Sequence, residues 1–448
     1  MSTPSIGWMN LPESLDLRVD SEMNLKLFGQ ACAVGIDIGT SGVRAVAVDN
    51  EGRPVAASES AFKTAGDTRT PAAWWTGVEN CLNDLCEKCS LNGIEGIVVD
   101  GTSGTLVALD AGNSPLGAAS LYNDTCDDPA IVAAIMDAAP ATSPALGATT
   151  ALGRAIQLSR HSGVHRIVHQ ADWIAMRLGQ GDAISDENNA LKTGYDLATE
   201  NWPDWLESAG MNRRLLPGVV RAGAAIGRIG KAGCALGLPK NTRVHAGTTD
   251  GCASFLATGA HHIGDAVTSL GSTLVVKIAS DRPINAPQFG IYSHRVGNLW
   301  LAGGASNTGG AVIRSLFGDA QLDDLTRKID VDRPTGLDYY PLLRPGERFP
   351  INDPSHAPRL EPRPEDDAVF FQGVLEGIAA IEELGYRQLV KLGAPQLRSV
   401  RTVGGGARNL RWREIRQRKL GVPFLEPLSE VAAAGAASMI IRERNLSS

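Results

Sequence analysis

The pattern of apolar and polar positions becomes regular at Ala33. Residues 1–31 show weak periodicity, so we expect them to form an extension on the surface. Apolar and alternating runs then predict strands, and a run with helical spacing predicts a helix at 70–90. The expected strands lie at 33–39, 43–55, 55–63, 94–104 and 105–112. Strands that are followed by a helical crossover to a further strand indicate an α/β fold.

The second half of the chain repeats part of this pattern. The stretch "IDIGTSGVRAVAVD" (36–49) and the stretch "TSLGSTLVVKIASD" (268–281) both run from a strand through glycine and hydroxyl residues into an alternating strand that ends in Asp. A unit that recurs so far along the chain predicts two domains of related fold. We expect an extension over 1–31, a first domain over 32–245 and a second over 246–448.

The elements between and after these repeats are also expected. Residues 150–220 should be mostly helical, and the strand pattern returns near residue 243. The second domain should end with a helix at 368–393, a strand at 398–406 and a helix at 409–421.

Composition and charge narrow the class of protein. Of 448 residues, 43% are hydrophobic and 20% are charged, and the formal net charge is -7. An acidic chain of this kind is expected to bind neither nucleic acid nor an anionic membrane. No apolar run approaches the roughly 18 residues of a membrane span, and the N-terminus lacks a secretory signal. The odd number of cysteines, 7, predicts free thiols in a reducing compartment. We expect a cytoplasmic protein, or a plastid protein if the N-terminus is a processed remnant.

The turn in "GIDIGTSG" (35–42) predicts an anion site. It is not a P-loop, because no Lys follows the glycines, and its glycines do not have the GxGxxG spacing. Backbone N–H groups and hydroxyls at Gly39 and Thr40 can still converge on a phosphate. Asp37 would face the same anion, which favours a Mg²⁺ ion between them. The alternative is a plain hairpin in which a buried Asp37 holds the turn.

A second turn has the same pattern. Gly271, Ser272 and Thr273 match Gly39, Thr40 and Ser41. Two such turns, one from each domain, predict a clamp for a nucleoside triphosphate in the cleft between the domains.

Longer stretches resemble the FGGY family of carbohydrate kinases. The matching pieces include "LYNDTCDD", "VHAGTTDGCASFLATGA", "FQGVLEGIAAIEELG" and "VGGGARNLRWREIRQRKLGVPFLEPLSEVAAAGAASM". The resemblance covers most of 33–441. It implies an α/β fold with two ribonuclease H-like domains around a central cleft, as in actin, Hsp70 and sugar kinases. It also implies that ATP and Mg²⁺ are used.

The resemblance assigns roles to residues of the second domain. Asp250 of "AGTTDG" is the implied base that takes the proton of the sugar hydroxyl, although an Asp before Gly is also a common turn residue. The implied nucleotide-lining residues are Gly310, Gly405, Gly406, Ala407, Arg408 and Asn409. Asn409 also fits a helix N-cap, and Trp412 could stack on the base.

The acceptor site is expected beneath the first turn. The backbone of Ser41, Gly42, Val43 and Arg44 could meet sugar hydroxyls. In "VDGTSGTLVALD" Ser103 and Gly104 remain from the family pattern, but the Gln-Met-His segment that is usual in xylulokinases is missing. "LYNDTCDD" keeps Asn123 and Asp124, which lie near the sugar in relatives. The chain most resembles the short, ribulose-preferring branch of photosynthetic organisms.

Two other clusters are given ordinary interpretations. Cys81, Cys86 and Cys89 have the spacing of an iron–sulfur site, but their segment is helical in character, so we expect packing or surface thiols, with a redox-active Cys86–Cys89 pair as the alternative. His161, His165 and His169 fall at a spacing that would share one helix face and could bind zinc, but a solvated or interdomain face is favoured.

The expected activity is therefore ATP-dependent phosphorylation of the terminal hydroxyl of a ketopentose, D-ribulose first and D-xylulose second. The alternatives are another polyol or ketose as acceptor, or a sugar-independent ATPase or binding module of the actin and Hsp70 type. The expected partners are a sugar and ATP, and the expected state is a monomer or homodimer.

Overall fold

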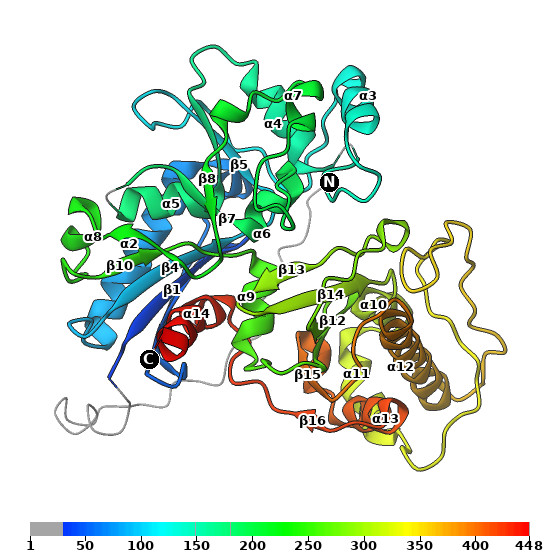
Figure 1. Ribbon diagram of the computed structural model, residues 1–448. Helices are drawn as coiled ribbons and strands as arrows, with labels where there is room; N and C mark the ends of the chain where they lie inside the picture. The colour runs from blue at the N-terminus through cyan, green and yellow to red at the C-terminus, as the bar shows by residue number, and fades with distance from the viewer. Residues whose placement is uncertain (1–29, 148, 180, 448) are drawn as a thin grey trace.

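The computed structural model describes residues 30–147, 149–179 and 181–447, and in this part of the chain two six-stranded mixed sheets define two domains (Figure 1). The first sheet has the strand order β3-β2-β1-β4-β10-β9. Its strands are β1 (Ala33–Ile38), β2 (Gly42–Val48), β3 (Pro54–Ala61), β4 (Gly96–Gly101), β9 (Ala225–Arg228) and β10 (Arg243–His245). β2 pairs antiparallel with β1, and β4 pairs parallel with the other edge of β1.

The second sheet repeats this arrangement, in the order β13-β14-β12-β11-β15-β16. Its strands are β11 (Asp265–Leu270), β12 (Leu274–Ser280), β13 (His294–Val296), β14 (Leu299–Ala305), β15 (Ser399–Val403) and β16 (Phe424–Leu425). β12 is antiparallel to β11, and β15 is parallel to it. The hairpins β1–β2 and β11–β12 are therefore equivalent, which confirms the expectation of two related α/β domains.

Helices cover both sheets. They are α2 (Pro71–Lys88), α3 (Pro129–Ala138), α4 (Ala151–Ser159), α5 (Gln170–Leu178), α6 (Glu187–Ala190), α7 (Trp205–Ser208), α8 (Lys231–Ala235), α9 (Asp250–Ala257), α10 (Gly310–Leu316), α11 (Asp319–Lys328), α12 (Asp367–Lys391), α13 (Leu410–Leu420) and α14 (Ala432–Ser447). In α2, Pro71 occupies the first turn, and Trp74, Val78 and Leu82 recur every fourth residue and are fully buried. Each such side chain contributes about 1.5–3 kcal/mol by burial.

The segment between 106 and 220 is less helical than its sequence predicts. β5 (Leu106–Leu109) pairs with β6 (Arg166–His169), and β7 (Ile184–Asp186) pairs with β8 (Gly218–Val220). The expectation of a mostly helical stretch was wrong because these short apolar runs are fixed by partners distant in sequence, which periodicity does not report.

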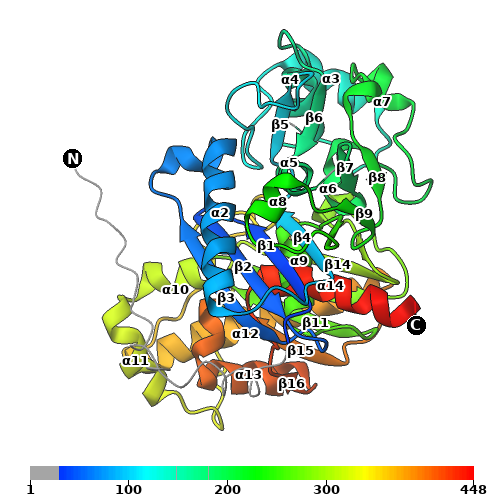
Figure 2. The same cartoon turned by 90° about the vertical axis from the view of Figure 1, so that its left-hand side faces the viewer.

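The last helix joins the two domains. α14 packs on β1 and against α9, as the two views show (Figure 2). A Cβ added to Gly35 would lie 1.8 Å from the carbonyl oxygen of Ala433, and one added to Gly435 would lie 1.9 Å from that of Ala253. The expected boundary near 245 falls between β10 and α9, and it stays a prediction. The residues before 30 that were expected to form an extension lie outside the described part.

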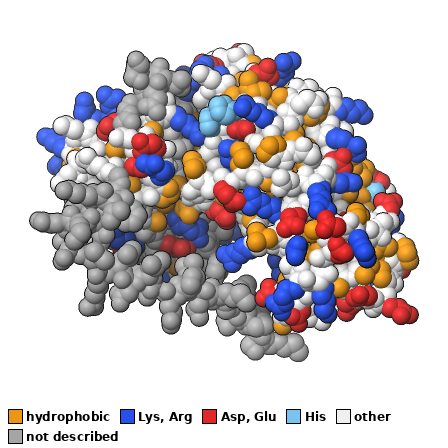
Figure 3. Space-filling model, turned by 90° about the horizontal axis from the view of Figure 1, so that it is seen from below, with side chains coloured by type: hydrophobic (Ala, Val, Ile, Leu, Met, Phe, Trp, Pro, Cys, Tyr) orange, Lys and Arg blue, Asp and Glu red, His pale blue; other side chains and the backbone are white. Residues whose placement is uncertain are grey.

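The basic run at 408–419 lies on α13 and its flank, where acidic residues balance it. Arg413 pairs with Glu426, and Arg418 pairs with Asp332 at 2.6 Å. On the face seen in Figure 3, basic and acidic side chains lie interspersed. Within the described ranges, no helix is long and apolar enough to cross a membrane.

Candidate active site

Three acidic residues lie near one another where parallel strands of the first sheet end. Asp37 of β1 lies in register with Asp100 of β4. Thr249, which follows β10, bridges to Gly101 in the parallel direction, and Asp250 comes next as the first residue of α9. The carboxyl ends of neighbouring strands in an open α/β sheet are the usual place for a ligand. Asp100 is a site residue that the sequence analysis did not single out.

Burial sets the electrostatics of Asp37 and Asp100. Asp100 is 0% exposed, and its burial, followed by repulsion from Asp37, raises the pKa of Asp100 well above its ordinary value. Burial also raises the pKa of Asp37, and a hydrogen bond with Asp100 opposes that rise. Of the two carboxyl groups, Asp100 is the one whose protonated form is favoured more strongly. Arg44, the cross-strand neighbour of Asp37, lies 3.8 Å from it and 2.9 Å from Glu59.

The strand ends fit a hard cation. Oδ1 of Asp37 and both carboxyl oxygens of Asp100 receive no hydrogen bond from a protein N–H or O–H group. Orphaned carboxyl oxygens are suited to Mg²⁺, which takes one or two carboxylates together with waters and substrate phosphates. No group of three or more metal-binding side chains occurs among the described residues, so a bound Mg²⁺ would depend on phosphate oxygens as well.

The first predicted phosphate turn is a tight reversal between β1 and β2. The N–H of Gly39 donates to the carbonyl of Gly42 at 3.0 Å, and Thr40 and Ser41 are exposed. Gly42 and Val43 belong to β2, which pairs with β1 on one side and β3 on the other. That their backbone meets sugar hydroxyls stays a prediction, and so it does for Arg44, which also lies in β2.

The second predicted turn is supported from α10. The N–H groups of Gly310 and Ala311 donate to the carbonyls of Gly271 and Ser272, at 2.9 and 3.0 Å. The N–H of Gly310 therefore holds the turn, and the approach of Gly310 to a nucleotide stays a prediction. Arg314 reaches back from α10 and donates to the hydroxyl of Ser272 at 3.2 Å. This places a cation beside the turn that the glycine pattern alone did not reveal.

The predicted adenosine loop is a short 3-10 turn (Gly405–Arg408) before α13. Asn409 is the N-cap of α13, accepts from the N–H of Trp412 at 3.0 Å and donates to Thr326 at 3.0 Å. Its amide is thus committed to the protein. Trp412 is 2% exposed, and its indole N–H donates to the carbonyl of Leu375. Because its ring lies beneath Gly406, where an added Cβ would be 2.8 Å away, Trp412 supports the loop and offers no free face for stacking on a base. Gly405, Ala407 and Arg408 line the open side.

Ser103 and Asp124, which are predicted to bind the acceptor sugar, differ in whether a protein group already binds their side chains. Ser103 has a buried hydroxyl oxygen without a partner, next to Gly104, whose carbonyl accepts from Arg154 at 2.7 Å. Asp124 instead makes a two-point ion pair with Arg69, at 2.6 Å for both bonds, which lowers the pKa of Asp124. Ser103 is therefore available to a ligand, and Asp124 is held by its arginine.

A buried polar connector, formed by side chains of α6 in the first domain, links the loop before Asp250 with β13 of the second sheet. The side-chain amide of Asn188 donates to the hydroxyl of Thr248 (3.0 Å) and to the carbonyl of Arg295 (2.8 Å), and its oxygen accepts from the N–H of Arg295 (3.0 Å). Asn189 donates to the carbonyl of Thr248 at 3.1 Å. The guanidinium of Arg295 also pairs with Glu187. The sequence analysis missed this connector.

The clustered histidines lie on more than one element, and the clustered cysteines lie in or beside one helix. His161, His165 and His169 do not share a helix, because the chain there forms a turn followed by β6. The helix expected for the three cysteines is α2, although Cys89 lies just beyond its end; all three thiols are free, and burial raises the pKa of Cys81 to about 11.

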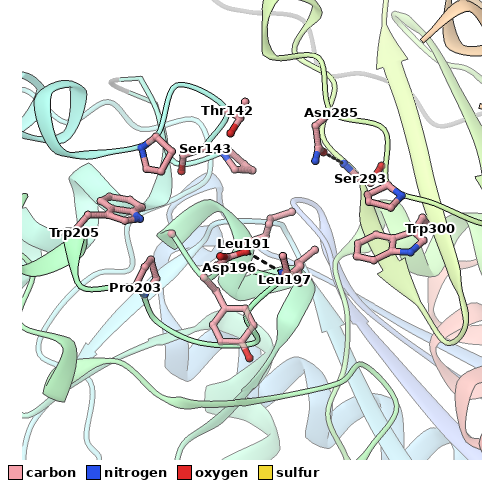
Figure 4. Close-up of a pocket in the computed structure, with 16 residues that line it drawn as sticks. Thr142, Ser143, Leu191, Asp196, Leu197, Pro203, Trp205, Asn285, Ser293 and Trp300 are labelled. Atoms are coloured by element: carbon pink, nitrogen blue, oxygen red, sulfur yellow. Dashed lines mark hydrogen bonds between the residues drawn. The ribbon is translucent and has the colours of Figure 1, made fainter. Parts of the chain in front are cut away.

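A separate hollow of about 210 Å³ lies between the domains, with Trp205 and Trp300 on opposite walls (Figure 4). The described residues that line it include Tyr195, Asn285 and Ser293 but no Lys, Arg or His. A hollow without a cation is poorly suited to phosphate, which favours the strand ends as the phosphate site.

Comparisons with known proteins agree with this architecture. The chain matches the FGGY family of carbohydrate kinases, with the N-terminal domain over 32–132 and the C-terminal domain over 266–441. It belongs to this family and is a carbohydrate kinase that uses ATP.

Individual relatives are distant. A xylulose kinase of Escherichia coli (strain K12) is 24% identical over 426 residues, which are 85% of this chain and 83% of that protein. An autoinducer-2 kinase of Yersinia pestis (strain Pestoides F) is 28% identical over 296 residues, 60% of this chain and 55% of that protein. The structure of a xyloylose kinase from Brucella ovis has a TM-score of 0.79 at 24% identity, covering 92% of this chain and 90% of that chain. A glycerol kinase from Plasmodium falciparum with ADP has a TM-score of 0.75 at 16% identity, covering 94% and 91%.

Proposed function

We propose that this carbohydrate kinase transfers the γ-phosphoryl group of ATP to the terminal 5-hydroxyl of a ketopentose, D-ribulose first and D-xylulose second. The observation that carries the proposal is the position of Asp37, Asp100 and Asp250 at neighbouring strand ends, next to the first of two equivalent hairpin turns. Two of the relatives are xylulose kinases, and xylulose is a ketopentose, which supports an acceptor of this class.

Asp250 is the proposed base. Its Oδ1 accepts the N–H of Gly251 at 2.8 Å, which fixes the carboxylate at the start of α9. A carboxylate held there can orient the acceptor hydroxyl and take its proton as the phosphoryl group leaves ADP. Phosphoryl transfer needs little more from the protein than such positioning and compensation of charge.

Asp37 is the proposed metal ligand, with Asp100 behind it. When bound, Mg²⁺ neutralises the charge that develops on the phosphates. Asp100, whose pKa is raised further than that of Asp37, is the protonated member of the pair in this proposal and leaves Asp37 as the carboxylate. Arg44 limits the negative charge of this pair at 3.8 Å from Asp37.

The remaining expected residues bind the nucleotide in this proposal. Gly39, Thr40, Gly271, Ser272 and Thr273 hold the phosphates, with Arg314 as a further cation at Ser272. Gly405, Gly406, Ala407 and Arg408 receive the adenosine, while Asn409 and Trp412 shape that loop from within.

The test is a coupled assay of ADP release over a panel of ketoses, aldoses and polyols, with Asp250→Asn as the variant. Asn keeps the shape and the bond from Gly251, so folding should be preserved. We expect acceptor-dependent release that is highest with D-ribulose and a loss of about 10²–10⁴-fold in kcat in the variant. Equal release with and without every acceptor would instead identify an ATPase, and full turnover by Asp250→Asn would refute the assignment of the base.

A further inference from the structure

Lys192, Lys277 and His294 lie near one another and form a wall beside Asp250, in which the two lysines carry the charge. Lys277, on β12 of the second domain, donates to the carbonyl oxygen of Gly251, the residue after Asp250. A Cβ at Gly251 would lie 2.6 Å from Nζ of Lys277. The ammonium group thus occupies the space that a side chain at 251 would take, next to the proposed base.

Lys192 approaches the same space from the first domain. It lies in a 3-10 turn (Leu191–Thr193), and its Cδ is 3.9 Å from the position of a Cβ at Gly104. Gly104 follows Ser103, whose buried hydroxyl oxygen lacks a partner. Nζ of Lys192 is 5.7 Å from the ring centroid of Tyr292, and that ring is 5.3 Å from the ring of His294.

The wall carries charge that the protein does not compensate. Neither Lys192 nor Lys277 forms an ion pair with a carboxylate in the described ranges, where Lys277 makes one hydrogen bond, to a neutral carbonyl. Desolvation by the surrounding protein, followed by repulsion from Lys277 and Lys192, lowers the pKa of His294 to about 3. His294 is therefore neutral near pH 7, and the two ammonium groups are the charges of the wall.

We propose that Lys192 and Lys277 determine acceptor specificity by binding an oxygen atom that only accepts hydrogen bonds, namely the carbonyl of a ketose or the carboxylate of a sugar acid. This inference rests on the proposed function, since it places the acceptor beside Asp250. An ammonium group has three donors and no acceptor. A carbonyl or carboxylate oxygen satisfies such donors directly, whereas a carbinol hydroxyl brings a proton of its own into a site that is rich in donors.

The hydrogen-bond donors of Lys192 and Lys277 predict an order of binding affinity among acceptors of equal chain length. A site built around a hydrogen-bonding group of the ligand rejects an analogue that lacks the matching group, because buried polar atoms are then left unpaired. D-Ribulose and D-ribonate should bind better than ribitol, which differs from D-ribulose only in having a carbinol in place of the carbonyl.

The test is calorimetric binding of D-ribulose, D-ribonate and ribitol to the full chain without nucleotide, so that no turnover is needed. We expect D-ribulose to bind about 10–100-fold more tightly than ribitol. In Lys277→Met and in Lys192→Met, two changes on different elements, this ratio should fall toward one. Lys240→Met, at an exposed position of the first domain, should leave it unchanged. ADP binding and the thermal midpoint of each variant show that the nucleotide site and the fold are intact.

Equal binding of D-ribulose and ribitol by the wild type would overturn the proposal, and so would no binding of any of the three compounds. A ratio that persists in both variants would overturn it as well. Weaker ADP binding with an unchanged sugar ratio would assign the wall to phosphate instead. A protein that shows the expected ratio but does not phosphorylate D-ribulose would keep this inference and refute the proposed activity.

Discussion

Replacement of Asn188 by Ala tests whether the hydrogen bonds of this residue to Thr248 and Arg295 position the proposed base. Asn188 is 0% exposed and makes three hydrogen bonds, two to the backbone of Arg295 and one to the hydroxyl of Thr248. Ala would leave the N–H and the carbonyl of Arg295 without partners. An orphaned buried polar group costs about 1–3 kcal/mol, so the two groups together give a loss of about 2–6 kcal/mol in the free energy of unfolding.

The same change should affect catalysis through Thr248. Thr248 precedes Asp250 by two residues and is fixed by Asn188 and Asn189. A shift of about 1 Å at a catalytic group can lower the rate on the order of 100-fold. We expect kcat with D-ribulose to fall about 10–100-fold in Asn188→Ala, with a much smaller change in the KM for ATP, because the side chain of Asn188 bonds to Thr248 and Arg295 and to neither phosphate turn.

Steady-state kinetics and denaturant unfolding measure both effects. Asn298→Ala is the matched control, since Asn298 is exposed in the turn between β13 and β14. Asn188→Asp keeps the oxygen that accepts from Arg295 but places a carboxylate oxygen against its carbonyl, so it should not restore activity. If Asn188→Ala kept the wild-type stability and a kcat within about twofold, the connector would have no part in positioning Asp250.

Two further predictions concern buried charges. Arg416 and Glu382 form a two-point ion pair whose side chains are 1% exposed. Arg416→Met should lower the free energy of unfolding by about 3–5 kcal/mol, and the double variant with Glu382→Leu should recover most of that loss. An Arg416→Met protein as stable as the wild type would contradict this prediction. Burial raises the pKa of Asp186 to about 6, so its contribution to stability is complete below its unfolded pKa and is lost as the pH rises through 6. Relative to wild type, Asp186→Asn should gain about 2 kcal/mol between pH 4 and pH 7, and a constant difference in unfolding free energy over that range would argue against the shift.

The duplicated hairpin is the part of the fold that could be predicted best. The stretches at 36–49 and 268–281 encode local features, namely an apolar strand, a Gly and hydroxyl turn and an alternating strand, and both form the expected antiparallel pair. The stretch at 150–220 could not be read in the same way, because β6 and β7 exist only through pairing with β5 and β8.

The candidate site shows a similar division. Asp37 and Asp250 stand beside glycine turns, so local motifs pointed to them, and their roles stay predictions. Trp412 was misjudged because its aromatic character does not tell whether the ring lies above or below the loop. Burial and the bond to Leu375 place it below.

Asp100 was missed although the sequence holds a signal for it. It is the one charged residue of the apolar strand "GIVVDG", just as Asp37 is of "AVGIDI". A carboxylate inside a buried strand is costly unless a proton, a partner or a ligand compensates it. The parallel register brings the two acids side by side, and their burial and mutual repulsion favour the protonated form of Asp100. A lone acid in an apolar strand is therefore a reason to ask which strand will lie beside it, and in this fold the answer is the strand that carries the second acid.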